Sequence, residues 1–406
     1  ISKFIGGGLG NLAGLSLGRE GPSIQIGGAV GKLLSKLLKR DINEERFMIS
    51  AGASAGLAAA FNAPISGTIF ALEEMHKNFS PLILIPCLVA SVVADYVSKN
   101  VFGLQSSFYF ISIPKSLPLF HYWHIVGIGV FSGLVGVLFN KVLLLGQDFH
   151  NILPIPKPFR PIIAFLVSIT LGFACYDVLG GGHALVEKIT DSTFTLTALI
   201  TLLILKLLFT SLSYGSSTQG GIFLPVLVLG ALSGVIYATF CQQINLLDSV
   251  YIHNFIVLGM AGILTAVVRS PILSIMLVTE MAGTFSHMLS FCLVAIISYL
   301  VAEFLNSKPI YESLLERLLA NRMDTASEEE ETDKVVTSLS ITSNMSVCNK
   351  ALREELFPKN VLIVSIKRGV KEFIPNGNTV ILPGDILTIL CYKSELAEVK
   401  QMTLTL

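Results

Sequence analysis

GREGP, at Gly18 to Pro22, places one carboxylate, that of Glu20, at the mouth of an apolar segment rich in glycine. Proline suits the first position of a helix, so the motif predicts a helix that begins at Pro22. The unpaired N–H groups of a helix start carry partial positive charge and bind carboxylates or free anions. The motif therefore predicts an anion site with Glu20 as a tethered competitor, the alternative being a tight turn with a capping acid.

The chain is apolar enough to lie in a membrane. Of its 406 residues, 52% are hydrophobic and 14% are charged, and the mean hydropathy is +0.71. This composition excludes an ordinary soluble domain and predicts a polytopic membrane protein. The zero net charge argues against nucleic acid as a partner, and six scattered cysteines predict neither a metal site nor disulfides. The expected spans are residues 48–72, 82–97, 124–145, 161–178, 195–212, 223–240, 255–268 and 287–304.

The apolar part contains an internal repeat. A Gly-rich approach, a Pro-started helix, a small-residue helix, a second Pro break and a Glu-Met end occur twice in the same order. The first copy has GREGP, AGASAG, NAPI and Glu74-Met75, and the second has GGIFLP, GMAG, SPI and Glu280-Met281. This alignment places Glu280 opposite Glu74, where we expect Glu280 to be structural. Duplicated halves with broken helices are typical of transporters.

Five motifs together resemble the CLC family of chloride channels and chloride/proton antiporters. They are GREGP, GGIFLP at Gly220 to Pro225, AAAFNAP at Ala58 to Pro64, the run Glu73-Glu74-Met75, and KPIY at Lys308 to Tyr311. The resemblance covers residues 1–318. It implies an all-α polytopic membrane fold of two inverted-topology repeats with broken helices, whose first helices and GSGIP loop precede this sequence. It also implies a homodimer in the bacterial inner (plasma) membrane that moves chloride and protons.

The resemblance also implies roles for single residues. Glu20 matches the gating glutamate, which blocks the outer anion site when it is ionised. Glu74 matches the inner proton-transfer glutamate, and Glu73 lies beside it, where protons enter. The positions expected to bind the anion are Gly18, Arg19, Gly21, Ile222, Phe223 and Tyr311. Backbone amides at such a site bind an anion without trapping it, as turnover requires.

The residues themselves leave alternatives open. Tyr311 also fits an interfacial aromatic anchor, and Glu74 fits a water-exposed helix end because His76 and Lys77 follow it. An acid at the end of an apolar run nevertheless indicates a proton relay. A passive anion channel of the same fold is the alternative to exchange, since channels of the family commonly lack an acid at this position. We expect no enzyme activity and no cofactor, because no nucleophile-and-base constellation is recognisable.

The composition changes after about residue 318. Residues 319–335 contain the acidic run Glu328 to Glu331 and predict a solvated linker. Residues 336–406 are similar to the TrkA-C regulatory domain of bacterial potassium-uptake and potassium-channel proteins, which implies a small α+β cytoplasmic module with a possible small ligand. Its expected elements are a helix at 347–356 and strands at 360–367, 379–382 and 386–391.

Overall fold

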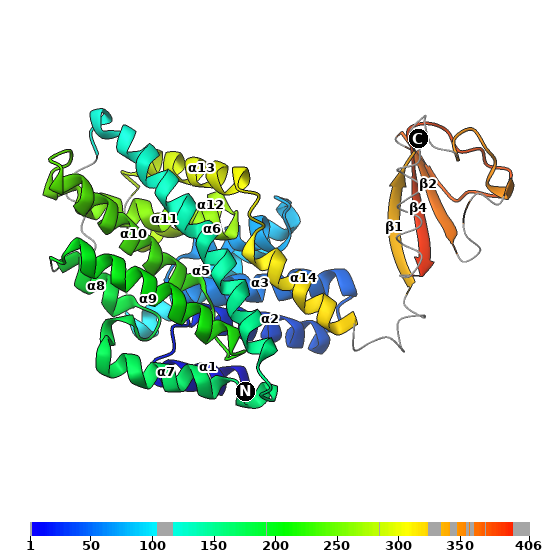
Figure 1. Ribbon diagram of the computed structural model, residues 1–406. Coiled ribbons are helices and arrows are strands. Elements are labelled where there is room, and N and C mark those ends of the chain that lie inside the picture. The colour runs from blue at the N-terminus through cyan, green and yellow to red at the C-terminus, as the bar shows by residue number, and fades with distance from the viewer. Residues whose placement is uncertain are drawn as a thin grey trace. The chain divides into compact units, whose positions relative to one another are not determined.

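The computed structural model describes residues 2–103, 117–191, 193–283, 285–323, 334–341, 347–354, 357, 361–369 and 371–392. The chain forms two compact units, Ile1–Ser313 and Leu314–Leu406 (Figure 1). The first unit is helical, and the second contains a sheet. Most of the predicted acidic linker, residues 324–333, lies outside the described residues.

The described residues from Ser2 to Met323 form helices, of which the last, α14, begins in the first unit and ends in the second. They are α1 (Ser2–Leu12), α2 (Glu20–Leu37), α3 (Ile42–Phe61), α4 (Pro64–Ile69), α5 (Pro81–Phe102), α6 (Trp123–Ile152), α7 (Pro161–Ala174), α8 (His183–Asp191), α9 (Leu196–Gly215), α10 (Phe223–Gln243), α11 (Ile252–Val268), α12 (Pro271–Ala282), α13 (Met288–Phe304) and α14 (Ile310–Met323). A π-helical segment, η1 (Phe70–Met75), continues α4.

Five helical stretches of the described residues are long and apolar enough to cross a membrane. They are Pro81–Phe102, Leu119–Ile152, Leu196–Gly215, Phe223–Gln243 and Ser249–Val268. Helices α7, α12 and α13 are shorter and also apolar. These helices confirm the predicted all-α polytopic membrane fold.

Two predicted boundaries are wrong. The expected span at residues 48–72 is divided, because α3 ends at Phe61 and α4 starts afresh at Pro64. Asn62 adopts a left-handed backbone with φ of +55°. Ala63 follows it with a non-helical backbone, because proline disfavours helix in the residue that precedes it. Helix α2 begins at Glu20, so Pro22 is its third residue and not its first. The first turn still tolerates proline, because its N–H groups have no intrahelical partner.

Close-packed backbones join neighbouring helices in both halves of the first unit. Helix α2 packs on α3 so tightly that a Cβ at Gly27 would collide with the carbonyl of Gly52. Helix α10 packs on α11 in the same way, and a Cβ at Gly230 would lie 2.6 Å from the carbonyl oxygen of Gly259. Small residues allow such approach between helices in a membrane. The repeat predicted from sequence is thus present in the packing.

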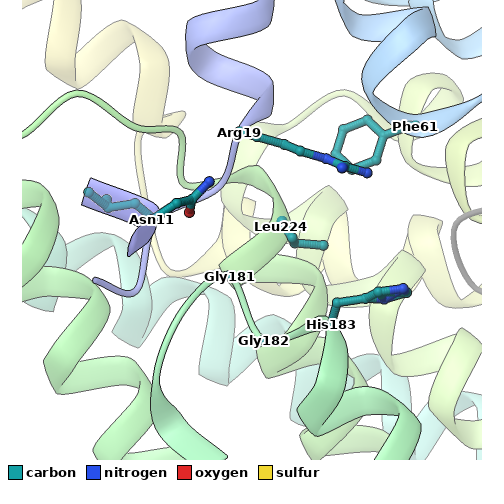
Figure 2. A pocket seen from close by; sticks show the side chains of 8 residues that line it. Asn11, Arg19, Phe61, Gly181, Gly182, His183 and Leu224 are labelled. Atoms are coloured by element: carbon teal, nitrogen blue, oxygen red, sulfur yellow. The ribbon is translucent and has the colours of Figure 1, made fainter. Parts of the chain in front are cut away.

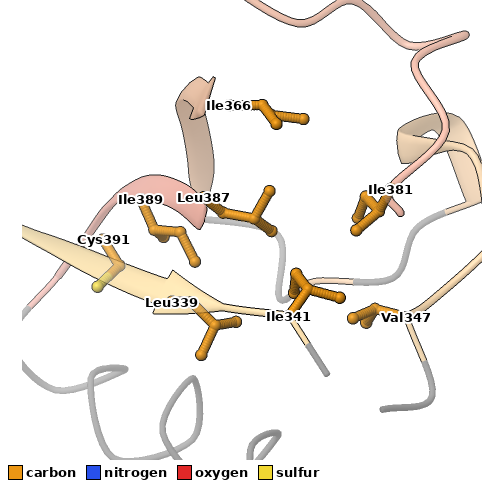
Figure 3. Close-up of a cluster of buried hydrophobic side chains, with 8 residues drawn as sticks. All are labelled: Leu339, Ile341, Val347, Ile366, Ile381, Leu387, Ile389 and Cys391. Carbon is orange, nitrogen blue, oxygen red and sulfur yellow. The ribbon is translucent and has the colours of Figure 1, made fainter. Parts of the chain in front are cut away.

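The second unit contains a four-stranded antiparallel sheet in the order β1-β4-β2-β3. Its strands are β1 (Lys334–Ser340), β2 (Leu362–Arg368), β3 (Lys371–Phe373) and β4 (Asp385–Tyr392). Alternate residues of β4 point into an apolar core with one side chain each of β1 and β2. Figure 3 shows this core, which consists of Leu339, Ile341, Val347, Ile366, Ile381, Leu387, Ile389 and Cys391.

The expected elements of this unit are partly correct. The strand predicted at 386–391 is β4, and the strand predicted at 360–367 is β2, which starts at Leu362. The strand predicted at 379–382 is wrong, because Val380 makes only an isolated bridge with Ala351. The helix predicted at 347–356 is replaced over the described residues by turns and the 3-10 segment Leu352–Glu354, while residues 355 and 356 lie outside them.

An ion pair joins the sheet at one end. Asp385 is fully buried, and its carboxylate accepts hydrogen bonds from Nε and Nη2 of Arg368 at 2.8 and 2.7 Å. The Leu382 N–H donates a third at 2.9 Å. The hydrogen bonds from Arg368 hold the pKa of the Asp385 carboxyl below its ordinary value, against the opposing effect of burial. Such a bidentate pair fixes the register of β2 on β4.

We expect Asp385 to make this unit sensitive to acid. A carboxyl whose pKa is lower in the folded state stabilises the fold above its unfolded pKa of about 3.9 and loses that contribution as pH falls through the folded pKa. Replacing Asp385 with Asn should lower stability at pH 7 by roughly 1–3 kcal/mol and flatten the acid dependence. Hydrogen-exchange protection of β4 in the full chain, followed from pH 7 to 3, measures both effects. Glu372→Gln, an exposed carboxylate on β3, should change neither, and an unaltered acid limb in Asp385→Asn would contradict the assignment.

Candidate functional site

Two helix starts meet head to head at GREGP and GGIFLP. The Gly18 N–H donates to the Gly221 carbonyl at 2.7 Å, and the Gly221 N–H donates to the Gly18 carbonyl at 2.8 Å. Each helix begins two residues after its bridging glycine, α2 at Glu20 and α10 at Phe223. The bridge therefore relates the two repeats by an approximate twofold and brings two positively polarised helix ends together.

The Glu20 carboxylate lies at the start of α10. Its side chain is 1% exposed, and Oε1 accepts a hydrogen bond from the Leu224 N–H at 3.0 Å. The sequence motif predicted Glu20 at the mouth of its own helix, and Glu20 is the first residue of α2. The Gly18–Gly221 bridge brings the start of α10 beside that of α2, so the Glu20 carboxylate also lies at the mouth of the other repeat's helix.

The residues predicted to line the site are brought together around this carboxylate. Ile222 and Phe223 are buried at the first turn of α10, and the Phe223 ring contacts that of Phe61 with 5.9 Å between centroids. A Cβ at Gly21 would lie 2.9 Å from the Gly221 Cα, so the two backbones touch here. Arg19 directs one guanidinium N–H to the carbonyl of Ala60 at 3.3 Å.

Tyr311 lies at the start of α14 and is half-buried. Its phenol is close enough to Glu20, Glu74 and Tyr214 to interact electrostatically with all three. This position links the surroundings of the two carboxylates, and it favours a site residue over the interfacial anchor considered from sequence.

Glu74 lies on η1, where its carboxylate accepts a hydrogen bond from the Ser270 Oγ at 2.6 Å. Both residues line a cavity of about 350 Å³ that also reaches Glu73 and Arg269. Lys77 and Glu312 form an ion pair at the same cavity. Glu74 is therefore half-buried beside a polar space, and sequence analysis did not identify Ser270 as its partner.

Glu73 caps a helix of the second repeat, and Glu280 caps a helix of the first repeat. Glu73 accepts hydrogen bonds from the N–H groups of Ile272 and Leu273 at 3.1 and 2.6 Å, at the start of α12. Glu280 accepts them from the N–H groups of Ile65 and Ser66 at 3.0 and 2.7 Å, at the start of α4. The structural equivalent of Glu280 is thus Glu73 and not Glu74, which corrects the alignment. Equal spacing from Pro64 to Glu73 and from Pro271 to Glu280 was the available sequence signal.

A second cavity, of about 220 Å³, lies on the Glu20 side (Figure 2). Arg19, His183, Phe61 and Leu224 line it, and Leu224 is the residue whose N–H binds Glu20. His183 follows a glycine turn in which Gly180 and Gly182 have φ of +65° and +95°.

Comparison with known proteins supports the geometry. Residues 1–303 match the family described as voltage gated chloride channel, and residues 336–403 match the TrkA-C domain. Two similar relatives are named H(+)/Cl(-) exchange transporter ClcA. The protein of Vibrio campbellii is 33% identical over 79% of this chain and 69% of its own length, and that of Vibrio parahaemolyticus is 34% identical over 79% and 70%.

Solved structures give the same result. The first unit resembles a slow cyanobacterial Cl-/H+ antiporter with a TM-score of 0.70 and 30% identity, over 78% of this chain and 75% of that one. It also resembles a CLC-type fluoride/proton antiporter with a TM-score of 0.64 and 25% identity, over 74% and 73% of the two chains.

The close contact of the two backbones at Gly221 leaves no room for a side chain. A Cβ at Gly221 would lie 2.6 Å from Glu20 Oε1 and 2.8 Å from the Gly21 nitrogen. Gly221→Ala should therefore lower the free energy of unfolding by about 1–3 kcal/mol, as overpacking does. Thermal unfolding of the purified full chain measures this effect. Gly8→Ala is the control, because a Cβ at Gly8 meets no atom within 4 Å, and equal stability of the two variants would show that the contact is not tight.

Proposed function

The chain belongs to the voltage gated chloride channel family, CLC, and we propose that it exchanges chloride for protons across a membrane. The observation that carries this proposal is the buried Glu20 carboxylate on the first turn of α10, where a helix start binds anions. A free chloride can occupy the same place only when the carboxylate leaves. The relatives named as exchange transporters support the same activity.

Glu20 acts as the gate. Its ionised carboxylate accepts the Leu224 N–H and stabilises the positive end of α10. A protonated carboxyl has no negative charge to offer the helix end, so it gives up this place to chloride more readily. A proton on Glu20 therefore favours the exchange of its carboxylate for a chloride at the helix start, and this preference couples the two ions.

Ile222, Phe223 and Tyr311 supply dipoles and no full charge to the anion path. The N–H groups of Ile222 and Phe223 lie beside the carboxylate position at the mouth of α10. The phenol of Tyr311 provides one O–H donor from the direction of Glu74. Neutral donors of this kind bind chloride weakly enough to release it. Gly18 and Gly21 hold the two backbones at the distance that this path needs.

Protons take a separate route on the Glu74 side. Glu74 exchanges protons with water in the 350 Å³ cavity, and Ser270 orients its carboxylate by a 2.6 Å hydrogen bond. Glu73 lies at the same cavity and holds the start of α12, which carries the segment that follows Ser270. Tyr311 lies within electrostatic reach of both Glu74 and Glu20, between the proton donor and the gate. The acid at Glu74 favours exchange over the passive channel considered from sequence.

The wider setting belongs to the same proposal. We infer a homodimer in the inner (plasma) membrane, with one pathway in each subunit and the TrkA-C domain on the cytoplasmic side as a regulatory module. Chloride and protons are the transported species, and the mechanism needs no cofactor and no enzymatic step.

Glu20→Gln keeps the size of the side chain and removes its charge and its titration. Proton movement should fall to background. Chloride flux should continue and should lose the pH dependence that the titration of Glu20 causes. Simultaneous recording of chloride and pH in proteoliposomes that contain the full chain measures both fluxes. Proton pumping against a gradient by this variant would remove Glu20 from the gate.

Glu74→Gln separates the two routes. Proton flux should be lost and chloride flux retained, because the chloride path through Ile222, Phe223 and Tyr311 does not include Glu74. The reversal potential of the variant should then equal the chloride equilibrium potential. Glu303→Gln, an exposed carboxylate paired with Arg269 at 3.1 Å, is the control and should keep full coupling. Absent coupling in the unmodified protein would instead establish the passive channel.

A further inference from the structure

The cavity on the Glu20 side is lined by two side chains that can carry positive charge. Arg19 precedes α2, and His183 is the first residue of α8. Figure 2 shows the Arg19 side chain reaching toward Phe61 and the His183 imidazole extending in the same direction, with Leu224 between them. Two elements that are 164 positions apart in the sequence therefore present basic groups to one space of about 220 Å³.

This cavity borders the gate directly. Leu224 lines the cavity with its side chain, and its backbone N–H donates to Glu20 Oε1 at 3.0 Å. Leu224 therefore lies between an anion in the cavity and the place that the Glu20 carboxylate occupies. Any charge on Arg19 or His183 acts on an anion immediately before it meets the gate.

Arg19 supplies a fixed charge. A guanidinium stays protonated at any physiological pH, and the hydrogen bond that Arg19 makes goes to the neutral carbonyl of Ala60. Within the described ranges, no carboxylate forms an ion pair with it. The Arg19 charge acts on the neighbouring Glu20 carboxylate and on any anion in the cavity.

His183 supplies a charge that depends on pH. Histidine changes its protonation between pH 5 and 8, and the charged groups that act on His183 are Arg19 and Glu187. Burial lowers the pKa of the His183 imidazole and the Arg19 charge lowers it further, whereas the Glu187 carboxylate opposes this shift. Nearby Asp177 is paired with Lys188 at 2.7 Å.

Among the described residues of the elements that pack on α8, the acidic side chain is Asp177 on the segment Tyr176–Val178, and it is paired with Lys188. Helix α10, which also packs on α8, contains no aspartate, glutamate, lysine, arginine or histidine. Behind the glycine turn, the buried Lys206 amine donates to the carbonyls of Val178 and Gly180 at 2.9 and 2.7 Å. The step from neutral to protonated His183 therefore makes the cavity more attractive to anions.

We propose that Arg19 and His183 form an access site for small inorganic anions outside the Glu20 gate, and that protonation of His183 strengthens anion binding there. The proposal rests on the proposed function, since it places the site on the chloride path. It adds a second pH-dependent step, which acts on anion affinity and leaves the proton route through Glu74 unchanged.

The test uses the full chain with Glu20→Gln, because this background removes the titration of the gate. The apparent KM for chloride flux is measured in proteoliposomes at equal pH on both sides, from pH 8 to pH 5. We expect it to fall about three- to tenfold toward pH 5, the range for one added charge near a partly solvated site. His183→Gln should abolish this fall, and His183→Lys should give a low KM at every pH. His253→Gln, a histidine outside the cavity, should leave the pH dependence as it was.

An unchanged pH dependence in Glu20→Gln with His183→Gln would overturn the access site. Absence of chloride flux in Glu20→Gln alone would contradict the proposed function instead. In that event, calorimetric titration of the purified variants with chloride at pH 5 and pH 8 decides the access site separately. A pH-dependent affinity that His183→Gln removes supports the site, and an affinity that does not respond to His183 rejects it.

Discussion

The close contact of two helix starts is the constraint on which the rest of this structure depends. The paired hydrogen bonds between Gly18 and Gly221 hold the N-termini of α2 and α10 against each other. Each helix end carries about half a positive charge, so their approach in an apolar surrounding is unfavourable without an anion. The Glu20 carboxylate supplies that anion. The proposed gate follows from this charge balance, because a chloride ion would meet the same requirement when the carboxylate leaves.

The frame around this contact is built to stay fixed. Glycine seams join α2 to α3 and α10 to α11 at backbone contact, which leaves little freedom for the helices to slide. The exchanged caps of Glu73 and Glu280 tie the half-helices α4 and α12 across the two repeats. Glu74 has no counterpart in this symmetry, since the second repeat has Met281 at the matching position. Glu74 binds the hydroxyl of Ser270 instead of a helix start, and in the proposed function it transfers protons.

The two cavities differ in the charged groups that line them. The space beside Glu20 is lined by Arg19 and His183, whereas the space beside Glu74 is lined by three carboxylates together with Lys77 and Arg269. They have no lining residue in common. Tyr311 lies near both carboxylates. In the proposed exchange, anions and protons would therefore meet different chemistry before their routes join at Glu20.

The sequence by itself determined the properties that depend on composition and on neighbouring residues. Mean hydropathy established a membrane protein, and GREGP, GGIFLP and the Pro breaks located the helix starts to within two positions. Alternating apolar residues located β2 and β4 of the second unit. These features follow from local rules, since proline, glycine and hydrophobic periodicity act within a few residues.

Only the tertiary structure decided which partners each carboxylate has. Glu20 caps a helix 204 positions away, Glu73 and Glu280 exchange caps, Ser270 binds Glu74, and His183 joins Arg19 at one cavity. The choice among many polar partners depends on how two repeats pack, and residue spacing does not encode that packing directly. The strand β1 was missed for a related reason, because its pairing with β4 links segments separated by more than forty residues.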